Sequence, residues 1–171
     1  MVAKFKIAVI PGDGIGPAVT ESATKVLGLL AEILGFDMRF VTAQAGDQAE
    51  RELGKPLPDG SYEKIVCSHA CLKGPVGETA RYVVIPLRQK LDLYANLRPS
   101  RSLPRLSKAG KTVDLVIVRE NTEGLYGGLE DRTEDYAFTI RVITRRASER
   151  IAKIACDLAQ SRRKKLTIVH K

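Results

Sequence analysis

Short apolar runs and amphipathic stretches alternate along this chain, and the alternation predicts strands that alternate with helices. Residues 5–10 are apolar apart from Lys6, which predicts a short buried strand. Over residues 19–34, apolar side chains recur every three or four positions, the period of one helix face. Residues 38–43 predict a second strand, and the polar residues 46–60 that follow carry turn signals.

The middle of the chain continues with an apolar stretch over residues 65–72 and a loop rich in glycine and proline. Residues 81–90 have helical character although they contain Pro86, which must lie in the first turn or kink the helix. Residues 91–97 predict a strand that ends at Pro99.

The last third of the chain predicts three more strands and one helix. Residues 113–118, 136–143 and 166–169 predict strands, the second of them exposed. A helix is expected before the last strand, with Thr144 as its cap and with an apolar face of Ala147, Ile151, Ile154, Ala155 and Leu158. Alternating strands and helices indicate an α/β protein with a mostly parallel sheet.

The first strand and first helix are joined by a glycine-rich turn in the stretch "VIPGDGIGPAV". A dinucleotide-binding turn has the spacing G-x-G-x-x-G, whereas Gly12, Gly14 and Gly16 alternate here. The carboxylate of Asp13 would also repel a pyrophosphate at the helix N-terminus. The glycines are therefore interpreted as permitting a tight turn, with Pro17 as a favourable first helical residue.

The amino-acid composition is typical of a globular protein and argues against a membrane-spanning, disulfide-linked or zinc-binding one. The chain has 171 residues, of which 44% are hydrophobic, enough for a sizeable core. No apolar run approaches the ~20 residues that span a bilayer, so we expect a cytoplasmic protein without a membrane segment. Three cysteines without framework spacing do not predict disulfides. Cys67, His69 and Cys71 lie in an apolar stretch, which favours a buried core role over a zinc site.

The net charge of +8 is compatible with an acidic partner. Its densest cluster, residues 162–165, follows the predicted helix, where cations complement the helix dipole. Aromatic residues make up only 5% of the chain and offer few platforms for stacking on bases. We therefore expect an acidic small molecule as the partner and no nucleic acid.

Three arginines at the ends of predicted elements suggest where such a molecule binds. Arg88 lies late in a helix, and Arg98 and Arg119 lie near strand ends. Guanidinium groups bind carboxylates in bidentate fashion, and ligands of α/β proteins bind at the carboxyl ends of strands. Tyr126, between glycines just beyond Arg119, is placed to present its phenol to a substrate, although a tyrosine packed under a loop fits the pattern equally well.

Segments in order along the whole chain resemble the β-decarboxylating dehydrogenases, the family of isopropylmalate, isocitrate, homoisocitrate and tartrate dehydrogenases. They are "PGDGIGP", "LKGP", "LDLYANLRP", "VIVRENTEGLY", "ITRRASERIAK" and "IVHK". The resemblance implies the isopropylmalate dehydrogenase-like α/β fold, a mostly parallel sheet with helices on both faces. It also implies that the glycine turn is not a dinucleotide cradle.

The resemblance assigns roles to individual residues. Arg88, Arg98 and Arg119 match the arginines that hold the malate-like carboxylates of the substrate. Tyr126 matches the tyrosine that helps to protonate the enol after loss of carbon dioxide. Lys171 matches the lysine that acts as general base on the hydroxyl group, usually from the partner subunit.

The resemblance also implies cofactors and partners. Lys73, Gly74, Glu78 and Thr79 match a loop near the nicotinamide of NAD, with NADP as an open alternative. Mg²⁺ or Mn²⁺ is expected as the metal, with its aspartate ligands beyond residue 171. Residues 127–143 resemble an arm that joins two subunits, so a homodimer or higher homo-oligomer is expected.

Only about the first half of a family member is represented. Residues 1–99 match the N-terminal part of the cofactor-side domain, and residues 100–171 match the start of the substrate and dimerisation domain. Strands and ligands from the other half are missing, so the chain alone is predicted to be inactive and prone to associate. Ala18 stands where the family usually has glutamate.

The helix before Arg88 bears on the substrate. The family's isocitrate enzymes usually have serine and asparagine there, whereas this chain has Tyr82, Val83, Val84 and Ile85. Valines pack against an isopropyl group but cannot hydrogen-bond a third carboxylate, which favours 3-isopropylmalate and hence leucine biosynthesis. Arg81 keeps isocitrate and homoisocitrate open, and an inactive fragment or non-catalytic homologue is a further alternative.

Overall fold

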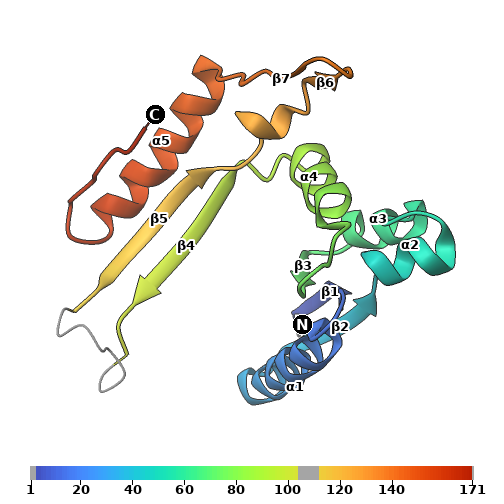
Figure 1. Ribbon diagram of the computed structural model, residues 1–171. Helices are drawn as coiled ribbons and strands as arrows, with labels where there is room; N and C mark the ends of the chain where they lie inside the picture. Colours follow the sequence, from blue (N-terminus) through green and yellow to red (C-terminus); the bar gives the residue numbers. More distant parts are fainter. Residues whose placement is uncertain (1–2, 104–111, 171) are drawn as a thin grey trace. The chain divides into compact units, whose positions relative to one another are not determined.

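The computed structural model describes residues 3–103 and 112–170, and the chain forms two compact units, Met1–Pro86 and Leu87–Lys171 (Figure 1). The division falls inside a helix, ahead of the predicted domain boundary between residues 99 and 100.

Unit 1 is built on a small parallel sheet. Its elements are β1 (Lys4–Ile10), α1 (Gly16–Leu34), β2 (Asp37–Thr42), α2 (Asp47–Leu53), α3 (Asp59–Val66), β3 (Ala70–Lys73) and the first part of α4 (Ala80–Lys90). The strand order is β2-β1-β3, and both pairings are parallel. Val9 pairs with Thr42 and Ile10 with Lys73, so the carboxyl ends of all three strands meet at one edge. The loops that leave these ends can therefore contact one another.

Two helices occupy stretches that the sequence did not identify as helical. The polar residues 46–60 contain α2, which ends at Gly54 in the left-handed conformation, and the first residues of α3. The apolar stretch 65–72 begins inside α3, and only Ala70–Lys73 forms a strand. The prediction of a buried Cys67, His69 and Cys71 was wrong, because the two thiols lie at a helix end and on a strand edge and all three residues are exposed. His69 accepts a hydrogen bond at Nδ1 from the Lys6 amide at 3.0 Å.

The core of unit 1 is small. Ala8, Ile10, Ala43 and Val83 are fully buried. The predicted apolar face of α1 is only partly covered by the residues that the structure describes. Ala31 is buried, whereas larger side chains of the helix remain exposed, namely Val19, Val26, Leu29, Leu30, Ile33 and Leu34. Such an apolar patch favours association of the isolated chain.

Unit 2 is built on an antiparallel ribbon with one long helix beside it (Figure 1). Its elements are the end of α4, β4 (Ala95–Arg101), β5 (Asp114–Glu120), the 3₁₀ turn η1 (Leu125–Gly127), β6 (Glu130–Arg132), β7 (Ala137–Thr139) and α5 (Arg145–Gln160). The prediction that Pro99 ends its strand was wrong, since β4 continues to Arg101 and Pro99 pairs with Val116. Proline fits at such a position because β4 has β5 as its only described neighbour and one side of the strand need not donate.

Three further expectations concern the last part of unit 2. Thr144 caps α5 as predicted, with its hydroxyl accepting from the Ala147 amide at 3.1 Å. Of the predicted strand 136–143, Ala137–Thr139 forms β7, which pairs with β6, and Val142 makes a single β-bridge with Gly124. Residues 166–169 form no strand, because no described segment pairs with them, and Val169 is 90% exposed.

Candidate functional site

Two groups of residues carry the candidate chemistry, one in each unit. The first lies where β1, β2 and β3 end. Asp13, in the turn after β1, accepts at Oδ2 from the amides of Asp47 (3.0 Å) and Gly77 (2.9 Å), and at Oδ1 from Gln48 (3.1 Å). Its carboxylate therefore faces amides of its own chain, and joins the three loops that leave the sheet edge.

Asp47, at the start of α2, likewise accepts hydrogen bonds from the loop that follows β3. Its Oδ1 accepts from the Thr79 hydroxyl at 2.6 Å and the Thr79 amide at 2.8 Å, and its Oδ2 accepts from the Glu78 amide at 3.1 Å. These hydrogen bonds, that of the Thr79 hydroxyl above all, lower the pKa of Asp47. Burial alone would raise the pKa of Asp13, but the amides of Gly77, Asp47 and Gln48 lower it overall. Both carboxylates are thus ionised at neutral pH.

The glycines of these loops are required by the close approach of the carboxylates. A Cβ on Gly77 would lie 2.0 Å from Asp47 Oδ2, and a Cβ on Gly46 would lie 2.3 Å from Asp13 Oδ2. No side chain fits at either distance without movement of the carboxylate. Gly46 and Gly77 are therefore required by the close contacts between these loops.

The loop expected near the nicotinamide lies in this first group. Lys73 Nζ donates to the Gly74 carbonyl at 2.6 Å, and Gly74 packs against Pro11, where a Cβ would meet the carbonyl at 2.2 Å. Thr79 is buried, whereas Glu78 is exposed. Because the amides of residues 77–79 are bonded to aspartates, they are not available to a phosphate, and the Glu78 side chain remains exposed.

The second group lies on the β4–β5 ribbon. Asn96 pairs with Arg119 in the antiparallel register, and Arg98 lies two residues from Asn96. Residues two apart on a strand share a face with each other and with their cross-strand partners. Arg98 and Arg119 therefore lie on one face of the ribbon, as diagonal neighbours.

Tyr126 joins this group. Arg119 Nη2 donates to the Tyr126 hydroxyl at 2.6 Å. The guanidinium carbons of Arg88 and Arg119 lie 5.3 Å and 5.5 Å from the centroid of the tyrosine ring. Gln89 Nε2 also donates to the Tyr126 carbonyl at 2.6 Å. The structure thus brings Arg88, Arg119 and Tyr126 into one cluster, with Arg98 on the same ribbon face as Arg119.

A hydrogen-bonded segment holds Tyr126 in place. Burial would raise the pKa of Glu120, but hydrogen bonds from the Thr122 hydroxyl and from the amides of Glu123, Thr122 and Asn121 lower it overall. The Glu123 carboxylate in turn accepts from Thr144, through the hydroxyl at 2.7 Å and the amide at 2.8 Å. The segment that leads from β5 to η1 is thereby tied to the start of α5.

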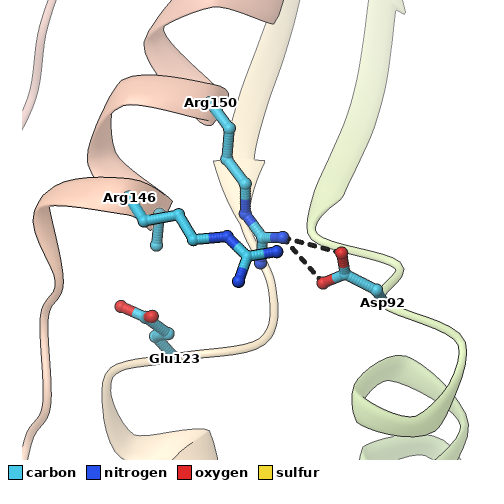
Figure 2. A pocket seen from close by; sticks show the side chains of 5 residues that line it. Asp92, Glu123, Arg146 and Arg150 are labelled. Atoms are coloured by element: carbon cyan, nitrogen blue, oxygen red, sulfur yellow. Dashed lines mark hydrogen bonds and ion pairs between the residues drawn. The ribbon is translucent and has the colours of Figure 1, made fainter.

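A cavity of about 120 Å³ lies beside this segment, lined by Asp92, Glu123, Arg146, Ala147 and Arg150. Figure 2 shows Arg146 and Arg150 extending from α5 into the space that Asp92 and Glu123 border. Arg150 Nη1 binds both oxygens of Asp92, at 2.7 and 2.8 Å, and its Nη2 donates to the Thr122 hydroxyl at 3.0 Å. Arg150 thereby ties α5 to Asp92 and to the Thr122 segment that leads to Tyr126.

The other predicted site residues are placed differently. Val83 is fully buried, whereas Val84 on the same helix is only half-buried. Lys171 lies outside the described residues. Within residues 3–103 and 112–170, no three His, Cys, Asp or Glu side chains lie close enough to hold a metal ion.

Two arginines of the basic cluster 162–165 form ion pairs within the chain. Arg162 and Arg163 bind the Asp114 carboxylate at 2.6 Å and 3.0 Å, which lowers its pKa. In the part of the chain that the structure describes, no helix is both long and apolar enough to cross a membrane.

The sequence did not identify several residues that organise these groups. Asp47 and Gln89 lie in none of the quoted motifs, Asn121 lies in "VIVRENTEGLY" but had no role assigned, and Asp13 had been interpreted only as a charge that repels phosphate. Asn121 is buried and donates to the Leu93 carbonyl at 3.2 Å. The only signal for Asp47 was its place after Gly46, in the connection that follows β2.

The chain is similar to proteins of one known family. The sequence profile of the family described as isocitrate/isopropylmalate dehydrogenase matches residues 6–171. The chain is 46% identical to a 3-isopropylmalate dehydrogenase of Saccharolobus solfataricus, over 98% of this chain and 50% of that protein. It is 43% identical to an isocitrate/homoisocitrate dehydrogenase of Thermus thermophilus, over 98% and 51% of the two chains.

A solved structure is similar as well. The crystal structure of isocitrate dehydrogenase from Methylococcus capsulatus matches with a TM-score of 0.79 and 43% identity, over 92% of this chain and 48% of that one. The chain thus spans about half the length of the relatives that it matches.

Proposed function

This chain belongs to the isocitrate/isopropylmalate dehydrogenase family, and we propose that it supplies the N-terminal half of an NAD-dependent enzyme that oxidises and decarboxylates 3-isopropylmalate. The observation that carries the proposal is the cluster of Arg88, Arg119 and Tyr126, because it joins anion-binding groups to a proton donor. Residues 1–99 and 100–171 would belong to the two domains of the complete enzyme.

The arginines bind and orient the substrate. A malate-like acid carries two carboxylates, and guanidinium groups on one face can bind each of them through paired hydrogen bonds. Arg98 and Arg119 share a ribbon face, and Arg119 also contacts Tyr126. An acid bound to Arg119 is thereby brought next to the phenol.

The remaining residues move protons. Lys171 would remove the proton of the substrate hydroxyl as the general base. NAD, when bound, would supply the acceptor for the hydride. After carbon dioxide has left, Tyr126 would help to protonate the resulting enol. The Arg119 hydrogen bond to Tyr126 keeps the phenol oriented toward the bound acid.

The described residues fit the nicotinamide end of NAD but do not fit a divalent metal ion. The Glu78 carboxylate is exposed beside the buried Thr79, and suits the cationic nicotinamide end of NAD. The described residues do not form a metal site, so the Mg²⁺ or Mn²⁺ ligands are proposed to come from the half of the enzyme beyond residue 171. No step above depends on them.

The substrate is proposed from α4. Val84 lies four residues before Arg88 and so shares its helix face, and it is half-buried. An isopropyl group of a bound acid can pack on Val84, whereas Val83 belongs to the core. The relative named isocitrate/homoisocitrate dehydrogenase keeps those acids as the alternative.

Replacing Val84 with threonine is expected to lower the preference for isopropylmalate over isocitrate about tenfold in the complete enzyme. Threonine has the same shape but places a hydroxyl against the isopropyl group. The preference is measured as the ratio of kcat/KM for the two acids. Val66→Thr, at an exposed valine of α3, is the control. An unchanged ratio in Val84→Thr would contradict the assignment.

The arm is proposed to join two subunits. Among the residues that the structure describes, β6 and β7 pair only with each other, and large apolar side chains around them are exposed, namely Leu129, Tyr136, Phe138 and Ile140. A two-stranded ribbon is marginally stable alone, so packing against a second copy would stabilise it.

The proposed function is tested by the intact mass of the purified protein and by NADH formation from isopropylmalate and isocitrate with magnesium. A species of 18.7 kDa is expected to associate and to show no turnover, and a full-length protein that contains this chain is expected to oxidise isopropylmalate. Turnover of isocitrate alone would transfer the proposal to that acid. Absence of turnover in the full-length protein would favour a non-catalytic homologue.

A further inference from the structure

We propose that Asp47 is a positioning residue, which fixes the Gly77–Thr79 loop so that Glu78 faces the nicotinamide side of the cofactor site. The proposal rests on the proposed function, because that function supplies the cofactor. It concerns a residue that lies outside the arginine cluster and that carries no motif.

Two aspartates bind three consecutive amides of this loop. Asp13 accepts from Gly77 at 2.9 Å, and Asp47 accepts from Glu78 at 3.1 Å and from Thr79 at 2.8 Å. The Thr79 hydroxyl adds a hydrogen bond to Asp47 at 2.6 Å. Successive amides held by fixed acceptors leave the loop backbone little freedom.

Asp47 is itself held in position. Its amide donates to Asp13 at 3.0 Å, and it lies in the first turn of α2. Asp13 in turn is held by its own amide, which donates to the Pro75 carbonyl at 2.8 Å. The loop after β1, the start of α2 and the loop after β3 thus form one closed network, in which Asp47 joins α2 to residues 78 and 79.

The network decides which groups of the loop are left for a ligand. The amides of residues 77–79 are occupied, and the Thr79 side chain is buried against Asp47. Glu78 keeps an exposed side chain on a fixed backbone. Without the Asp47 acceptors, the backbone at Glu78 would be flexible. Ordering it on cofactor binding would cost conformational entropy and would lower the affinity.

The test compares Asp47→Asn and Thr79→Val with two controls. Asparagine keeps the shape of aspartate but replaces one acceptor oxygen with a donor, and valine removes only the Thr79 hydroxyl. Thr79→Ser keeps that hydroxyl and its hydrogen bond to Asp47, so the amide exchange rates of Glu78 and Thr79 should stay the same. Asp37→Asn changes an exposed aspartate at the start of β2.

The first measurement is amide hydrogen exchange of this chain. Asp47→Asn is expected to speed exchange at Glu78 and Thr79 about tenfold or more, and to leave Ala8 in the central strand unchanged. Thr79→Val should show a smaller increase, and both controls should show none. Unchanged exchange in Asp47→Asn would overturn the proposal.

The second measurement is NAD⁺ binding to the full-length protein, followed by titration calorimetry in the absence of the hydroxy acid. Asp47→Asn is expected to raise the Kd for NAD⁺ about tenfold, and to leave the KM for the hydroxy acid within about twofold. An unchanged Kd, with hydroxy-acid oxidation intact, would overturn the role of Asp47 alone. A raised Kd in a protein whose unsubstituted form oxidises no hydroxy acid would support Asp47 and overturn the proposed function. Absence of NAD⁺ binding by the unsubstituted protein would overturn both.

Discussion

Replacing Tyr126 with phenylalanine is expected to lower kcat of the complete enzyme about 10²- to 10⁴-fold, the usual contribution of a positioned proton donor. Phenylalanine keeps the ring that lies beside Arg88 and Arg119 and removes only the hydroxyl that Arg119 contacts at 2.6 Å. Arg119 then remains available for a carboxylate. The KM for the hydroxy acid should therefore change less than about threefold.

Steady-state kinetics with the preferred hydroxy acid separates the two parameters. Tyr136→Phe is the matched control, because Tyr136 is 61% exposed in the segment beside β7 and lies outside the arginine cluster. The proton-transfer role would be contradicted by a rise in KM at constant kcat, since that result indicates uniform binding of substrate and transition state. Equal effects of the two substitutions would indicate a general loss of structure.

Replacing Gly12 with alanine is expected to destabilise unit 1 by about 2 to 5 kcal/mol. The first cause is steric, because a Cβ at Gly12 would lie 1.8 Å from the Pro75 carbonyl oxygen, a backbone atom that can yield only with the whole loop. Overpacking of this kind costs about 1–3 kcal/mol. The second cause is the φ of +75°, which costs an L-residue about 1–2 kcal/mol.

Urea unfolding of the chain measures this effect against two other glycines. Gly14 has a φ of +59° but no atom within 4 Å of its Cβ position, so Gly14→Ala should cost only the backbone strain of about 1–2 kcal/mol. Gly28 lies in open space within α1, and Gly28→Ala should stabilise the chain by about 0.5–1 kcal/mol. Equal losses for Gly12→Ala and Gly14→Ala would show that the approach of Pro75 imposes no constraint.

The sequence predicted most elements that have a strong local signal. β1, β2 and β5, the helices α1, α4 and α5, and the Thr144 cap were all expected within a few residues. Hydrophobic periodicity and capping residues act over one or two helical turns, so they are readable without tertiary structure. The helices α2 and α3 were missed because they are short and polar, and contacts with the rest of unit 1 decide such segments more than propensity does.

The strand predicted over residues 166–169 failed for a related reason. Its side chains are apolar and β-branched at Ile168 and Val169, which satisfies the local pattern. A strand, however, exists only where another strand accepts and donates its hydrogen bonds, and no described segment does so here. Local pattern alone cannot supply a pairing partner.

For the candidate site, the sequence by itself determined the residue types: arginines suited to carboxylates, a tyrosine between glycines, and the ordered motifs that indicate the family. Only the tertiary structure decided which of them meet. The β4–β5 register places Arg98 and Arg119 on one face, and η1 brings Tyr126 to Arg119. The tertiary structure also shows that Asp13, which was expected to repel a phosphate, accepts hydrogen bonds from three backbone amides. The physical reason is that hydrogen bonds and ion pairs require atoms within about 3 Å of each other, and loops far apart in sequence reach that distance only after the strands have paired.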